Sequence, residues 1–177
     1  MDETNRMLEQ ADGSEGLSRD TQEGKYMTFK SGPEYFGLEI KYVQQIIQFQ
    51  TITKIPETED YIKGLINLRG RIIPVVDVRT RFKQGACEYN EKTCILVINV
   101  KSTTVGLIVE QIAEVAEIKK ENILPPPSLG RAEKAHHKYV YGIGKVGNTV
   151  KLLLDPEKLL YDDDPADMDP AKKGEEE

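Results

Sequence analysis

The sequence predicts a mainly β protein built from two tandem five-stranded barrels that pack side by side and carry short helices. Three observations lead to this prediction. Short runs rich in isoleucine, valine and leucine are broken every few residues by glycine, proline or asparagine, helical periodicity is scarce, and one pattern occurs twice along the chain. A length of 177 residues accommodates two small units of this kind.

Strands are expected wherever an apolar run lies between turn residues. The expected ranges are 25–30, 35–40, 46–49, 65–68, 71–76, 94–100, 104–109, 115–118, 139–143 and 149–154. Short helices are expected after Asp77, up to Phe82, and after Asp155, over 156–161. Aspartate caps a helix by accepting bonds from free backbone N–H groups, and Pro156 suits the first helical position.

An internal repeat organises the chain. The pattern that begins Gly37-Leu38 recurs at Gly106-Leu107, 69 residues later, and the run 64–82 recurs at 142–160, 78 residues later. The two shifts differ by the length of one inserted loop, so they describe a single repeat.

The repeat divides a folded part, 24–161, into one subdomain at about 25–90 and a second at about 91–155. Five strands in so few residues suggest a small barrel that hides its own edges. A unit of this size is only marginally stable alone, so we expect the two to share an interface or core and to unfold together.

Both ends of the chain are acidic. Residues 1–23 hold seven acidic residues against two arginines, and residues 162–177 hold eight against two lysines. Segments so charged and so poor in apolar residues are predicted to be disordered tails. Their removal from the total of −6 leaves the folded part at +5. The start lacks a basic region before an apolar one, and no apolar run approaches the ~20 residues of a membrane span, so a cytoplasmic protein is expected.

Several patterns suggestive of catalysis or cofactors have simpler explanations. The GxGxxG run at 142–147 is followed by a strand instead of the helix that a dinucleotide site needs, so it predicts a hairpin turn, with positive φ at Gly147 and Asn148. The adjacent His136 and His137 would point in opposite directions on an extended segment and could not share a metal. With no nucleophile beside them, neither an enzyme, a metal site nor a cofactor is expected.

The remaining chemistry is that of binding. Cys87 and Cys94 match neither a zinc nor a redox spacing and are expected to be free thiols. The +5 charge is spread without a dense cluster, so a nucleic-acid-binding barrel is a weaker alternative.

The two repeats differ at one turn. Asn67, Arg69 and Arg71 stand where the second repeat has Lys145, Gly147 and Thr149. A difference on a shared scaffold marks a candidate for what one repeat does alone, although a solvated turn arginine would look the same.

Five segments resemble the CheW family of chemotaxis adaptors. They are YFGLEIKYVQQI, the pair IP, YIKGLINLRGRIIPVVDVRTRF, VGLIVEQIAEV and YGIGKVGNTVKLLLDPEKLL, within residues 25–161. The resemblance implies two SH3-like barrels and an adaptor without enzymatic activity or cofactor. It would bind the cytoplasmic hairpin tip of a chemoreceptor and the regulatory domain of the histidine kinase CheA, and would meet the membrane only through receptors, in clusters at its inner face. A CheW-like domain of another signalling complex is the alternative.

The resemblance also implies site residues. The receptor-binding groove would comprise Val43, Gln45, Ile46, Asn67, Leu68, Arg69 and Val105. The kinase-binding candidates would be Gly64, Arg69, Gly70, Cys94 and Val115. Family members often read VQEI where this chain has VQQI, and Gln45 cannot make the charge-assisted contact of a glutamate.

Overall fold

The structure is a computed structural model that describes residues 22–85, 88–126 and 138–161. The predicted acidic tails, apart from residues 22 and 23, lie outside the described residues, as do Cys87, His136 and His137.

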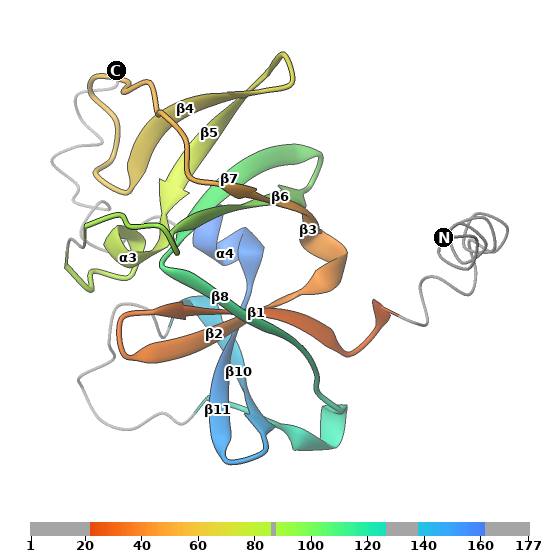
Figure 1. Ribbon diagram of the computed structural model, residues 1–177. Coiled ribbons are helices and arrows are strands. Elements are labelled where there is room, and N and C mark those ends of the chain that lie inside the picture. The colour runs from red at the N-terminus through yellow and green to blue at the C-terminus, as the bar shows by residue number, and fades with distance from the viewer. Residues whose placement is uncertain (1–21, 86–87, 127–137, 162–177) are drawn as a thin grey trace, which may run out of the picture.

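Two sheets make up the fold, and the mainly β prediction is confirmed. The first has six strands in the order β8-β1-β2-β11-β10-β9, and the second has five in the order β3-β6-β7-β5-β4. Figure 1 shows one above the other, with helix α4 between them. The elements are β1 (Lys25–Ser31), β2 (Glu34–Glu39), η1 (Ile40–Tyr42), β3 (Val43–Gln48), β4 (Ile62–Leu68), β5 (Arg71–Asp77), α3 (Val78–Arg81), β6 (Cys94–Val100), β7 (Thr103–Val109), β8 (Gln111–Glu117), η2 (Lys120–Asn122), β9 (Ile123–Leu124), β10 (Val140–Val146), β11 (Thr149–Leu154) and α4 (Pro156–Tyr161).

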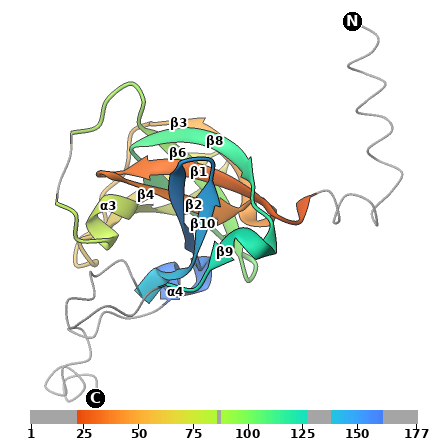
Figure 2. The same cartoon turned by 90° about the horizontal axis from the view of Figure 1, so that it is seen from below.

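The repeats exchange their first hairpins. Hairpin β1–β2 of the first repeat lies in the sheet of β8 to β11, and hairpin β6–β7 of the second lies between β3 and β5. Each hairpin is joined to its host by a short parallel pairing, β2 with β11 and β7 with β5. The view from below shows the β10–β11 hairpin crossing β1 and β2 (Figure 2).

This exchange corrects the predicted subdomain boundaries. The contiguous ranges 25–90 and 91–155 do not coincide with the sheets, because each sheet takes strands from both repeats. Equivalent hairpins have the same apolar pattern, so the repeat alone cannot show which copy completes which sheet.

Two strands have the bounds that the sequence predicted. The predicted ranges 94–100 and 149–154 match β6 and β11. Strands β3, β4 and β8 begin three or four residues before the predicted starts, and β9 was not predicted. The first residues of β3 and β8 include glutamines. Because these strands are half exposed, they contain polar residues, and a search for apolar runs does not recognise such residues as strand.

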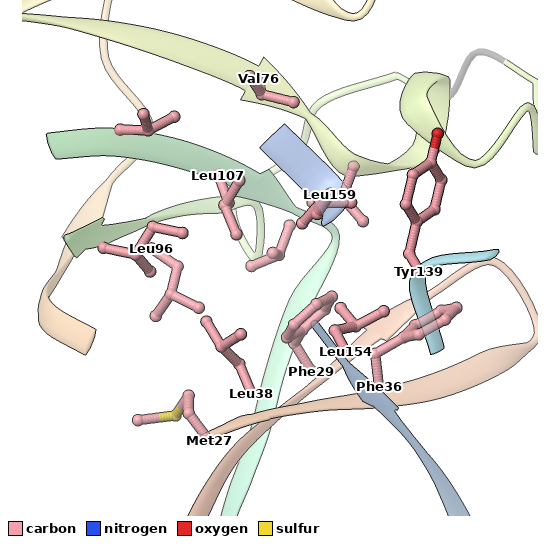
Figure 3. Packing of buried hydrophobic residues seen from close by; sticks show 14 of the residues in the cluster. Met27, Phe29, Phe36, Leu38, Val76, Leu96, Leu107, Tyr139, Leu154 and Leu159 are labelled. Carbon is pink, nitrogen blue, oxygen red and sulfur yellow. The ribbon is translucent and has the colours of Figure 1, made fainter. Parts of the chain in front are cut away.

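The largest hydrophobic cluster lies between the sheets and draws residues from both. Figure 3 shows Phe29, Leu38, Leu96 and Leu107 pointing toward one another, with Leu159 of α4 close by. A smaller cluster lies on the other face of each sheet. Strand β6 is therefore covered on both sides, which explains its nearly continuous apolar sequence CILVINV.

The helices are fixed by caps and by one buried cation. As predicted, Asp77 accepts hydrogen bonds from the N–H groups of Arg79 and Thr80, and Asp155 caps α4 in the same way. Arg81 is buried, and its Nε donates to the Leu159 carbonyl at 2.8 Å. Because its guanidinium also covers the rings of Tyr61 and Tyr139, Arg81 ties the end of one repeat to the end of the other.

The GxGxxG run forms the predicted hairpin, with Val146 paired to Thr149. Only Gly147 has a positive φ, of 59°, so the expectation for Asn148 was wrong. One left-handed residue suffices for this turn.

Candidate functional site

The turn between β4 and β5 holds an arginine in an unusual backbone conformation. Arg69 has φ of 53° and Gly70 has φ of 83°, the combination found in a type I′ turn. Asn67 shapes the turn, since its Oδ1 accepts a hydrogen bond from the Gly70 N–H at 2.9 Å. In the equivalent turn of the second repeat, Gly147 takes the left-handed place of Arg69.

The Arg69 side chain is exposed and makes no hydrogen bond or ion pair to any described residue. A left-handed conformation costs a residue with a Cβ about 1–2 kcal/mol relative to glycine. The fold thus carries an arginine where a glycine would fit better and gains no visible contact from it, which favours a binding role.

An apolar side chain that was not predicted lies beside this turn. Ile72 is 60% exposed, and it pairs across the hairpin with Asn67. Its neighbour Ile73 is 2% exposed, so the two side chains lie on opposite faces of the strand. The apolar run Ile72-Ile73 reads as core in the sequence, and only the strand register identifies Ile72 as a surface residue. We call Asn67, Arg69, Gly70 and Ile72 the hairpin tip.

Leu68 anchors the hairpin tip from below. It packs with Ile47 and Phe49 against the smaller cluster of the five-stranded sheet. The tip of β4–β5 and strand β3 therefore rest on the same core. Three further residues of the predicted receptor groove, Val43, Gln45 and Ile46, lie on β3.

The predicted groove is otherwise corrected by the structure. Val105 is 5% exposed and belongs to the cluster between the sheets, so its side chain does not line a surface. That cluster packs between the two sheets (Figure 3). Val43 is half-buried and packs on the same cluster, whereas Ile46 is 43% exposed.

The predicted kinase-binding residues do not form one patch. Gly64 is buried, and a Cβ there would lie 2.1 Å from the Thr53 carbonyl oxygen, so the backbone bridge between Thr53 and Leu65 requires this glycine. Val115 is exposed but belongs to the other sheet. Of the predicted kinase-binding residues, only Arg69 and Gly70 belong to the hairpin tip.

Cys94 is partly buried opposite Gln48, and burial raises the pKa of its thiol despite a hydrogen bond with the Ile112 backbone. A thiol with a raised pKa is a poor nucleophile. Among the described residues, no three acidic, histidine or cysteine side chains gather to hold a metal ion. A cavity of about 870 Å³ near Tyr26, Glu39 and Lys120 includes none of the predicted site residues.

Comparison with known proteins decides the family. A family model described as the CheW-like domain matches residues 25–164. The chain belongs to the CheW-like family. It is 34% identical over 157 residues to a chemotaxis protein CheW of Klebsiella aerogenes, covering 89% of this chain and 93% of the relative. A chemotaxis protein CheW of Helicobacter pylori is 28% identical over 156 residues, 87% of this chain and 93% of the relative.

A solved structure extends the likeness to the fold. The scaffolding protein TtCheW of Thermoanaerobacter tengcongensis aligns with a TM-score of 0.70 at 34% identity, over 77% of this chain and 86% of that one. The predicted family, its fold and its adaptor role in chemotaxis are thereby confirmed. Within the described part of this CheW-like chain, no helix is long and apolar enough to cross a membrane.

Proposed function

We propose that this CheW-like protein is a cytoplasmic, non-catalytic adaptor that joins a chemoreceptor to a CheA-type histidine kinase. The hairpin tip of β4–β5 is the surface that binds. The observation that carries this proposal is Arg69, exposed, without a partner among the described residues and held left-handed where the second repeat has Gly147.

The chemistry of the hairpin tip suits protein recognition. A guanidinium offers forked donors to a carboxylate or to backbone carbonyls, and its geometry cannot be reproduced by lysine. Ile72, 60% exposed, adds an apolar anchor beside it. Arginine and large apolar side chains that are buried together are typical of the residues that dominate protein interfaces.

We expect the surface that binds the receptor to extend from the hairpin tip of β4–β5 in this chain toward strand β3. The receptor tip of this family is a helical hairpin, and an amphipathic helix needs an apolar strip with polar neighbours. Ile46 on β3 is exposed, and its neighbour Ile47 packs with Leu68 against one cluster. Val43 is half-buried and packs on the cluster between the sheets instead. The shared cluster under Ile47 and Leu68 supports a binding surface that runs from the β4–β5 turn to Ile46.

The deciding experiment mixes the purified protein with a chemoreceptor cytoplasmic fragment and a CheA-type kinase. We expect a ternary complex by size-exclusion chromatography, with kinase activity responding to the receptor. Binding to each partner alone is measured by calorimetry. The absence of both binary complexes would contradict the proposal. Binding to nucleic acid that collapses steeply with salt would instead support the alternative.

A further inference from the structure

Strand β3 forms one end of the five-stranded sheet, and β6 is its only strand neighbour in the described part of the chain. No other described residue forms a hydrogen bond with the backbone of residues 44–48 on the side away from β6. An open edge of this kind presents unpaired N–H and C=O groups, which are a template for another strand.

The composition of this edge is unusual. Residues 42–53, YVQQIIQFQTIT, contain no charged residue, no glycine and no proline. Natural sheets commonly protect open edges with charges, prolines or bulges. Apart from the irregular register between Val43 and Gln45, residues 43–48 carry none of these devices.

The equivalent strand of the second repeat carries the charged side chains that β3 lacks. Strand β8 is the equivalent end strand of the other sheet, and it has Glu114 and Glu117 where β3 has Gln45 and Gln48. In a symmetric pairing of β8 about Val115, the two copies of Glu114 would be diagonal cross-strand neighbours, about 7–8 Å apart, where like charges repel each other. The glutamines of β3 remove this repulsion.

We propose that the open edge of β3 pairs with β3 of a second copy of this chain, antiparallel and with Ile46 opposite its own copy. In this register Gln44 lies opposite Gln48. Amide side chains donate and accept hydrogen bonds, so glutamine is complementary to itself. A two-fold axis through Ile46 makes the contact the same on both copies and closes it as a dimer.

The dimer should be weak. Pairing of two six-residue strands buries less surface than a stable interface requires, so we expect dissociation in the micromolar to millimolar range. The same strand carries Val43, Gln45 and Ile46 of the predicted receptor groove, and a bound receptor would therefore compete with the second copy.

Sedimentation velocity of the full chain, from micromolar to millimolar concentration and without receptor or kinase, tests the proposal. We expect a monomer–dimer equilibrium in the wild type. Ile46→Lys places like charges opposite each other and should raise the dissociation constant of the dimer at least about tenfold. Val115→Lys on β8, the matched exposed position of the second repeat, should leave the dimer unchanged. Circular dichroism checks that both variants fold.

A cross-link locates the contact. In a background with Cys87→Ser and Cys94→Ser, Ile46→Cys should form an intermolecular disulfide, because directly opposed residues of antiparallel strands lie within the Cα separation of a disulfide. Val115→Cys should not. A wild type that stays monomeric over the whole range, or a dimer equally weakened by Val115→Lys, would overturn the proposal. Neither of these two outcomes tests the adaptor function, because the experiments contain no receptor and no kinase.

Discussion

At the scale of a single residue, Arg69 is where stability and the proposed binding role favour different side chains. Its φ of 53° is strained for arginine but not for glycine. Arg69→Gly, which copies the turn of the second repeat, should leave the free energy of unfolding unchanged or raise it by up to about 1 kcal/mol. The same variant should weaken partner binding by about 1–3 kcal/mol.

Two further variants at this position sharpen the test. Arg69→Ala should lose a similar amount of binding free energy, and Arg69→Lys should recover only part of it, because an ammonium group lacks the forked geometry. Denaturant unfolding and calorimetry of each folded variant with receptor fragment and kinase domain provide the two quantities. Wild-type affinity of Arg69→Ala for both partners would show that Arg69 is a solvated turn residue.

A second residue, Lys151, tests the cost of a buried charge. Its side chain is 4% exposed, its Nζ lies 3.9 Å from a Glu114 carboxylate oxygen and 4.2 Å from the centre of the Tyr35 ring. The equivalent residue of the first repeat is Ile73, a core residue. Desolvation of an ammonium group offsets much of what such a pair contributes.

Lys151→Met should therefore leave the stability unchanged or increase it by about 1 kcal/mol. Lys151→Ala, which leaves a cavity, should lower it by about 2–3 kcal/mol. Urea unfolding measures both. A loss for Lys151→Met as large as that for Lys151→Ala would mean that the charge itself holds β11 against β2.

At the scale of elements, hairpin β4–β5 contains two glycines with different roles. A Cβ at Gly64 would meet the Thr53 carbonyl at 2.1 Å, whereas a Cβ at Gly70 would meet nothing within 4 Å. Gly64→Ala should destabilise the protein by about 3 kcal/mol or more, and Gly70→Ala by only about 1 kcal/mol. Thermal unfolding compares the two. Equal losses would show that the bridge between Thr53 and Leu65 can shift without cost.

Helices, strands and turns could be predicted where a local sequence pattern is compatible with only one structure. Buried strands such as β6, the caps at Asp77 and Asp155, and the hairpin at Gly147 follow from local rules. The early start of β3 and the exposure of Ile72 depend on pairing register, which the sequence does not state. Arg69 was singled out because its counterpart is glycine, and its binding role stays a prediction. Val105 was misplaced because an apolar strand residue has the same appearance in a sequence whether it lies in a core or in a groove.

For the whole molecule, the exchanged hairpins make the repeats depend on each other. Neither sheet can form from one repeat, because β6–β7 lies between β3 and β5 and β1–β2 lies between β8 and β11 (Figure 1). The central cluster and the bond from Arg81 to Leu159 also cross from one repeat to the other. The chain should accordingly unfold in a single cooperative transition.

A cut between the repeats gives the most direct test of this dependence. A protease site inserted after Gly85, which is exposed and whose added Cβ would meet nothing, should be cleavable in the folded protein. The two fragments should then co-elute as one particle with native circular dichroism, and should separate only in denaturant, because both sheets need strands from both fragments. Each fragment isolated in denaturant should stay unfolded on dilution alone and regain structure when the two are mixed. Fragments that separate in native buffer and keep their β structure would mean that each repeat forms a barrel by itself, and the exchanged topology would then be wrong.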